Sequence, residues 1–145
     1  MNIFEFYLSE INKLILEHKN DLKLTNLENL KSINLEVPPN QFNSDLSCNI
    51  SLVLGKSNDL NPKDLAIQLK DLFMNNIENF SEIEIAGPGF LNIKLSKTAL
   101  IKNINSIIKH NNFYGSNKSN ERYNIEFVSA NPTGPMHVGH CRGAI

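Results

Sequence analysis

The stretch EIEIAGPGFLNIKL, residues 82–95, predicts a β-hairpin and decides how the rest of the chain is interpreted. Its first half alternates isoleucine with glutamate, and its second half alternates leucine or isoleucine with Asn92 and Lys94. Such alternation is typical of strands with one apolar face. The segment Gly87-Pro88-Gly89 reverses the chain between the two halves. We therefore expect two antiparallel strands whose apolar side chains share one face.

Helical patterns flank this hairpin on both sides. Apolar residues three and four apart predict a helix over Phe4–His18. Asn61 and Pro62 begin a second helix, with asparagine as the cap and proline in the first position. Ser96 can cap a third helix that runs from about Lys97 to His110. Its apolar face comprises Leu100, Ile101, Ile104, Ile107 and Ile108.

The remaining segments are shorter. Residues 27–33 predict a short helix, and residues 35–37 a short strand that ends at Pro38-Pro39. Residues 44–56 fit both a strand and a helical stripe, and we favour the helix because a capping residue precedes the stripe and Gly55 follows it. Residues 111–121 are polar and rich in turn formers, which indicates a linker.

After the linker, residues 123–128 predict a strand, residues 129–135 a loop, and His137 the start of a helix. A strand, loop and helix in this order form half of a βαβ unit. We expect an α+β domain over residues 1–110, in which helices pack on a small antiparallel sheet. The linker would cover residues 111–121, and residues 122–145 would begin a Rossmann-like α/β domain.

Composition narrows the class of protein. The chain has 145 residues, 41% of them hydrophobic, and a formal net charge of −1, so no overall basic excess attracts nucleic acid. Its two cysteines, Cys48 and Cys141, rule out a disulfide framework and suit a reducing cytosol. The N-terminus lacks a signal-peptide pattern, and no apolar run approaches the length of a membrane span. We expect a cytoplasmic protein without a membrane contact.

The sequence His137-Val138-Gly139-His140 carries the clearest chemistry. Residues three apart share one helix face, and at a helix start that face lies beside free backbone N–H groups. Two imidazoles and these amides suit a polyanion such as the phosphates of a nucleotide. Gly139 would let a flat base or sugar approach the backbone. A metal site at His137, His140 and Cys141 is disfavoured, because the adjacent ligands would strain a tetrahedral centre.

The longer string from Glu126 to His140 resembles the signature of arginyl-tRNA synthetases, which are class I aminoacyl-tRNA synthetases. The segment HVGH, residues 137–140, matches the HIGH motif of that class. Upstream, residues 36–39 with Asp45 and Asn49, and residues 83–92, look like the amino-terminal domain of the family in the same order. The resemblance therefore spans essentially the whole chain.

The resemblance implies an arginine–tRNA ligase that activates arginine with ATP and transfers it to the 3′ end of its tRNA. His137, Gly139 and His140 would bind ATP, and the two histidines would be catalytic through electrostatic stabilisation. Ser129 and Asn131 would bind arginine. Three residues would shape the loop between them: Pro132, Gly134 and Pro135. ATP would act as a substrate accompanied by Mg²⁺, and no metal or prosthetic group would be resident.

The partners implied are the tRNA for arginine, arginine and ATP, and we expect the complete enzyme to be a monomer. The amino-terminal domain would hold the tRNA near its elbow. Six cations against one acid between Lys94 and Arg122 agree with this, although on charge alone a solvated helix face is the favoured explanation. The family's second signature loop and anticodon-binding domain are not among these 145 residues. The alternative is therefore a non-catalytic tRNA-binding module; a small nucleotidyltransferase is less favoured because its motif would lie near the amino terminus.

Overall fold

A computed structural model describes residues 2–116, 120–126, 133–135 and 137–140. The chain divides into two compact units, Met1–Gly115 and Ser116–Ile145. Each unit is described by itself below. Among the described residues, no helix is long and apolar enough to cross a membrane.

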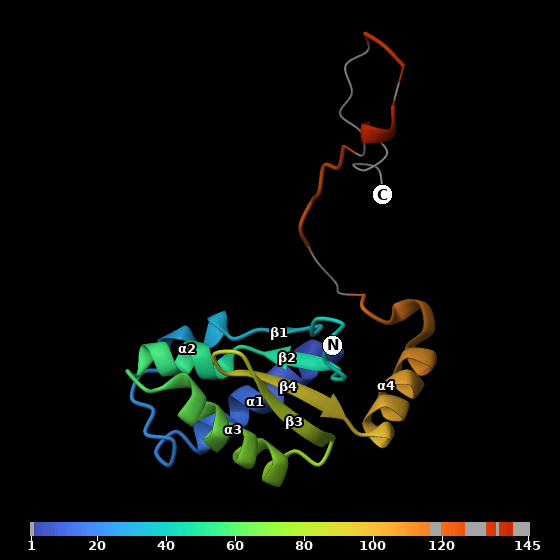
Figure 1. The fold of residues 1–145 in the computed structure, drawn as a ribbon. Helices are drawn as coiled ribbons and strands as arrows, with labels where there is room; N and C mark the ends of the chain where they lie inside the picture. The colour runs from blue at the N-terminus through green and yellow to red at the C-terminus, as the bar shows by residue number, and fades with distance from the viewer. Residues whose placement is uncertain (1, 117–119, 127–132, 136, 141–145) are drawn as a thin grey trace. The chain divides into compact units, whose positions relative to one another are not determined.

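The first unit consists of four α-helices and a four-stranded antiparallel sheet (Figure 1). The helices are α1 (Ile3–Glu17), α2 (Ile50–Ser57), α3 (Pro62–Asn76) and the peripheral α4 (Lys97–His110), with short 3₁₀ turns at η1 (Glu28–Ser32) and η2 (Asn111–Phe113). The strands are β1 (Leu35–Glu36), β2 (Leu46–Cys48), β3 (Phe80–Ala86) and β4 (Phe90–Leu95). Their order in the sheet is β1-β2-β4-β3. The predicted α+β class is confirmed for this unit.

Strand register gives the sheet two different faces. Leu35 pairs with Cys48, Cys48 with Leu91, and Leu91 with Ile85, so these apolar side chains share one face. That face belongs to a single buried core that also takes in α1, α2 and α3. The opposite face carries the polar row that runs across the sheet in register: Glu36, Ser47, Asn92 and Glu84.

Local signals account for the helix starts. Asn2 and Glu5 form a capping box on α1, and Asn61 Oδ1 accepts a hydrogen bond from the Lys63 amide at 2.9 Å. Ser96 Oγ accepts one from the Ala99 amide at 3.2 Å at the start of α4. The three longer predicted helices are confirmed, as is the hairpin of β3 and β4.

The prediction of one helix over residues 44–56 is wrong in its first part. Leu46–Cys48 forms a strand between β1 and β4, and the helix begins only at Ile50. Asn49 separates them: its side chain accepts from the Asn34 amide at 2.8 Å and donates to the Ser32 carbonyl at 3.2 Å. Pairing with two neighbouring strands outweighs the helical spacing of this short segment.

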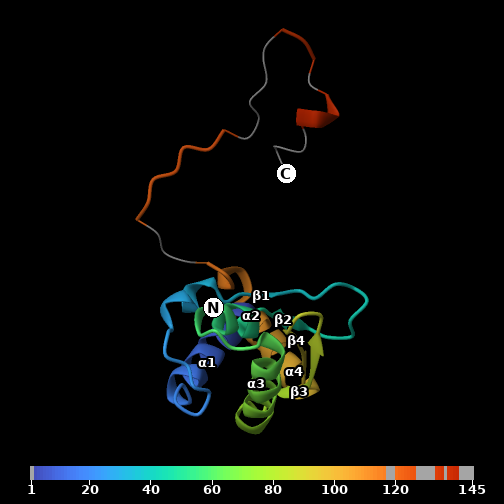
Figure 2. The same cartoon turned by 60° about the vertical axis from the view of Figure 1, so that its left-hand side comes forward.

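The helix α4 exists as predicted, and Leu100 of its apolar face packs against the core, but the rest of that face is not buried. Ala99 is its one buried residue. Four isoleucines are exposed: Ile101, Ile104, Ile107 and Ile108. In the first unit, α4 lies at the periphery of the sheet and helices (Figures 1 and 2).

The second unit departs from the prediction in one respect. Residues 121–126 form no strand, so the strand predicted over 123–128 is wrong for residues 123–126, and residues 127 and 128 lie outside the described ones. A parallel strand needs a hydrogen-bonded neighbour, and no described residue supplies one. Residues 138–140 are helical, in agreement with the expected helix start. The Rossmann-like domain stays a prediction.

Candidate functional site

The turn between β3 and β4 is held in place by contacts with α2 and the start of α3. Gly87 and Gly89 have φ angles of 54° and 138°, which favour glycine. The buried Ser51 hydroxyl donates a hydrogen bond to the Gly89 carbonyl. A Cβ on Gly89 would lie 2.9 Å from Ser51 Oγ and 3.1 Å from the Pro62 carbonyl oxygen. The turn therefore fixes the position of Phe90, which follows it.

A hollow of about 350 Å³ lies on the polar face of the sheet, beside this turn. We call it the sheet hollow. Phe90 is 38% exposed at its edge, and Phe42 comes from the loop between β1 and β2. None of its lining residues is a lysine or arginine. The other lining residues are Glu36, Val37, Pro39, Ser47, Ala86, Gly87 and Asn92.

Asn92 is the unusual residue of the sheet hollow. Alternation along β4 would expose its side chain, yet it is only 2% exposed. Its Nδ2 atom is buried and has no hydrogen-bond partner among the described residues. A buried unpaired amide costs about 1–3 kcal/mol, so such a group needs an explanation. Proteins bind unstacked nucleobases by stacking them on exposed aromatic rings and by hydrogen bonds from groups such as side-chain amides.

Sequence reasoning missed this hollow. In the sequence Asn92 is only a polar residue in an alternating strand, and no pattern distinguishes Phe42. The available signal was an amide, rather than a charged residue, in the middle of a strand that otherwise alternates cleanly. The significance of Asn92 depends on the loop between β1 and β2, which contributes Val37, Pro39 and Phe42 to the lining of the hollow. The strand pattern alone does not reveal this.

Two residues behind the family resemblance have structural partners. Asp45 Oδ2 accepts a hydrogen bond from the Leu95 amide at 2.7 Å, and the Asp45 amide donates to the Ile93 carbonyl at 2.9 Å. Asp45 thus extends the pairing of β2 with β4. Asn49 joins the end of β2 to the segment before β1, as described above. Both residues support the sheet on which the hollow lies.

The histidines of the second unit lie against one another. The ring centroids of His137 and His140 are 4.0 Å apart. The His137 amide donates to His140 Nδ1 at 3.1 Å, and the Gly139 amide donates to His137 Nδ1 at 3.1 Å. Because each Nδ1 accepts a hydrogen bond, each neutral ring carries its proton on Nε2. The segment therefore offers two Nε2–H donors.

Gly139 has a steric role in this arrangement. A Cβ at this position would lie 3.0 Å from His137 Cε1 and 3.1 Å from its Nδ1. The absence of a side chain on Gly139 thus allows the His137 ring to accept a hydrogen bond from the Gly139 amide. The loop residues Gly134 and Pro135 are exposed. Ser129, Asn131 and Pro132 lie outside the described residues.

The Cys48 thiol is poorly suited to nucleophilic or metal-binding chemistry. Its side chain is fully buried, and desolvation raises the pKa of its thiol to about 12, an effect that a backbone hydrogen bond at Ile50 partly opposes. A thiol in this state is a poor nucleophile and a poor metal ligand. Within the described residues, no group of three or more His, Cys, Asp or Glu side chains is arranged to hold a metal ion.

Sequence comparison supplies the family. The model of the arginyl-tRNA synthetase N-terminal domain matches residues 9–95, which run from the middle of α1 to the end of β4 and include the whole sheet. The chain belongs to the arginyl-tRNA synthetase family. It is 45% identical to the arginine–tRNA ligase of Pelagibacter ubique over 147 aligned positions, which cover all of this chain and 26% of that protein.

Other relatives agree. The arginine–tRNA ligases of Bartonella quintana and Rickettsia felis are 42% and 35% identical, again over all of this chain. The chain spans about a quarter of the length of these synthetases. The predicted membership of the arginyl-tRNA synthetase family is thereby confirmed.

Proposed function

We propose that the first unit is a tRNA-binding domain of an arginine–tRNA ligase, and that its sheet hollow holds one unstacked base near the tRNA elbow. The unpaired Asn92 amide beside Phe90 carries this proposal. A base carbonyl or ring nitrogen would accept from Nδ2, and the base would stack on the phenylalanine ring. Membership of the synthetase family makes a tRNA the nucleic acid concerned.

The charges of the residues favour binding of a base in the hollow and of phosphates around it. The hollow is lined by Glu36 and by no cation, so it suits a base rather than a phosphate. Phosphates would be met by lysines outside it, such as Lys94 on β4 and Lys97, Lys102 and Lys109 on α4. Phosphate contacts of this kind supply affinity that falls with salt.

Titration of fluorescent arginine tRNA with the chain tests the proposal. We expect binding at low salt, with a dissociation constant that rises steeply with salt. Phe90→Leu keeps an apolar side chain but removes the stacking ring, which is worth about 1–3 kcal/mol per base, so the affinity should fall roughly tenfold or more. Phe6→Leu is the matched control, because Phe6 is 43% exposed on α1 and does not line the sheet hollow. Equal effects of the two changes would contradict the proposal.

We also propose that the second unit supplies part of the ATP site of the complete ligase. The Nε2–H donors of His137 and His140 would bind phosphate oxygens and stabilise the charge that develops when the arginine carboxylate attacks the α-phosphate. Gly139 would lie at the nucleotide, and Mg²⁺ would accompany the phosphates. Ser129 and Asn131 would bind arginine, and Pro132, Gly134 and Pro135 would shape the loop. A Rossmann-like continuation, a cytoplasmic location and a monomeric enzyme belong to the same proposal.

Pyrophosphate exchange tests this second part. Residues 1–145 would replace the matching quarter of the Pelagibacter ubique ligase, and the hybrid would be assayed for arginine-dependent exchange into ATP. Replacement of both histidines by alanine should abolish exchange while tRNA binding persists. The alternative function is a non-catalytic tRNA-binding module. It predicts tRNA binding by the chain and no exchange by the hybrid.

A further inference from the structure

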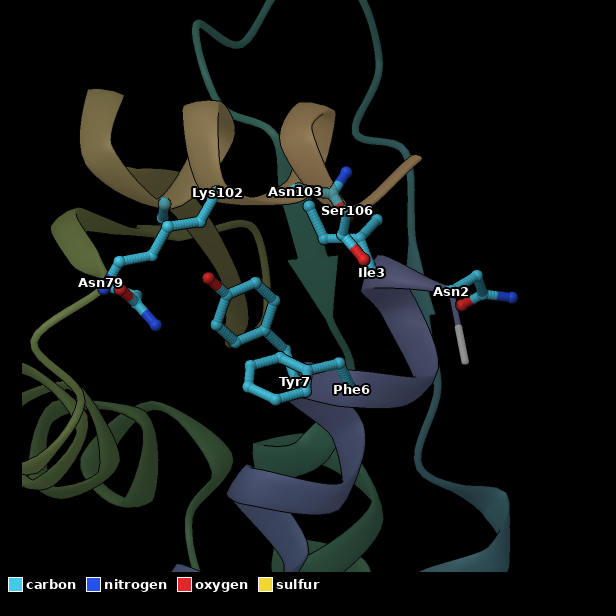
Figure 3. A pocket seen from close by; sticks show the side chains of 9 residues that line it. Asn2, Ile3, Phe6, Tyr7, Asn79, Lys102, Asn103 and Ser106 are labelled. Atoms are coloured by element: carbon cyan, nitrogen blue, oxygen red, sulfur yellow. The ribbon is translucent and has the colours of Figure 1, made fainter. Parts of the chain in front are cut away.

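The polar side of helix α4, together with the buried Ala99, is the side turned toward the rest of the first unit. Lys102, Asn103 and Ser106 face Phe6 and Tyr7 of α1 across a hollow of about 230 Å³ (Figure 3). Tyr7 is buried below them, and desolvation raises the pKa of its hydroxyl. The side of α4 that a core would normally bury is therefore not the side turned toward the core.

The apolar side of α4 is turned outward instead. Ile101, Ile104 and Ile108 are 57%, 54% and 69% exposed, and Ile107 is 38% exposed. Positions i, i+3, i+6 and i+7 of this run lie on one stripe, the pattern of a helix that docks into a groove. Ser96 caps the N-terminus of α4, so the stripe lies on a helix with a stabilised start. We call these four residues the isoleucine stripe.

A second copy of this chain is a poor occupant for the stripe. The exposed fractions of the four residues add up to about two whole isoleucines, whereas a stable interface takes roughly 20–30 residues from each partner. Helix α4 also carries Lys97, Lys102 and Lys109 and no acidic residue, so two such helices would repel each other.

We infer that the isoleucine stripe docks on the remaining three quarters of the synthetase, against an apolar surface with acidic residues at its margin. The relatives have this much length outside the part that matches this chain. A small apolar contact suffices there, because covalent linkage gives a high effective concentration. The inference rests on family membership and not on the sheet hollow, so loss of tRNA binding would leave it intact.

Hydrogen exchange of the α4 amides tests the inference. It would be measured in the 145-residue chain and in the hybrid in which these residues replace the matching quarter of the Pelagibacter ubique ligase. We expect at least tenfold slower exchange in the hybrid. Ile104→Lys with Ile108→Lys should return exchange in the hybrid to the rate of the chain alone. Thr98→Lys with Asn105→Lys adds the same charge at two exposed positions outside the stripe and should leave the protection in place.

Other outcomes would overturn the inference. Equal exchange in chain and hybrid would mean that nothing in the synthetase covers the stripe. A dimer of the 145-residue chain in sedimentation, lost in the double variant, would make a second copy the occupant. Pelleting of the chain with phosphatidylserine vesicles, again lost in the double variant, would assign the stripe to a lipid surface. Circular dichroism of the variant chains shows whether α4 is retained.

Discussion

Replacement of Asn92 by leucine should stabilise the protein and weaken its binding to tRNA. Leucine is similar in size to asparagine and carries no donor, so the change removes the unpaired buried Nδ2. Such an atom costs about 1–3 kcal/mol, and apolar replacement at a buried site recovers part of it. We expect the free energy of unfolding to rise by about 1 kcal/mol, which corresponds to a melting temperature roughly 4–8 °C higher for a domain of this size.

The same substitution should lower the affinity for arginine tRNA about tenfold, because the hydrogen bond to the base is lost. Asn12→Leu is the matched control. Asn12 Oδ1 is also buried without a partner among the described residues, but it lies on α1 beside Leu8 and Leu16. This control should stabilise the chain and leave the affinity unchanged.

Thermal unfolding followed by circular dichroism and tRNA titration at one fixed salt concentration give the two readouts. A lower melting temperature for Asn92→Leu would show that the Asn92 side chain is satisfied in the folded protein. An unchanged affinity would show that its amide does not contact the tRNA. Either result would refute the reasoning that joins the unpaired atom to recognition.

Three further predictions concern the fold and are read by denaturant unfolding. Gly89→Ala should lower the free energy of unfolding by roughly 2–4 kcal/mol, because a Cβ there would meet Ser51 and Pro62 at a φ of 138°. Gly87→Ala, where a Cβ meets nothing, should lower it by about 1–2 kcal/mol. Equal losses would contradict the packing argument. Asn61→Ala removes the cap of α3 and should cost about 1 kcal/mol, and no loss would mean that the cap contributes nothing. Between pH 9 and about 12 the thiol of Cys48 is protonated in the folded state but ionised in the unfolded state. The free energy of unfolding should therefore fall by about 1.4 kcal/mol more per pH unit than it does in Cys48→Ala. Identical slopes would refute the burial of the thiol.

Local signals in the sequence were enough for most of the first unit. Asparagine or serine caps fixed the starts of α3 and α4, and alternation around two glycines fixed the hairpin. The short strand β2 could not be separated from a helical stripe, since three residues carry too little periodicity to decide. Its state is set by β1 and β4 on either side, which are distant in sequence.

The site was less accessible to sequence reasoning. The histidine segment could be recognised as a motif, and the structure adds the Nδ1 hydrogen bonds that fix the tautomers. The sheet hollow could not be recognised, because part of its lining comes from a loop far from Asn92 in sequence. Periodicity likewise predicted the apolar stripe of α4 but not the direction in which it faces. Direction depends on what each helix packs against.

The central claim is that the sheet hollow binds a base of the tRNA elbow, and chemical footprinting of arginine tRNA tests it most directly. With the chain bound, the account predicts protection confined to elbow nucleotides, including one base whose protection disappears with Asn92→Leu and persists with Asn12→Leu. Protection at the acceptor end or anticodon alone, or an elbow footprint that Asn92→Leu leaves unchanged, would contradict it.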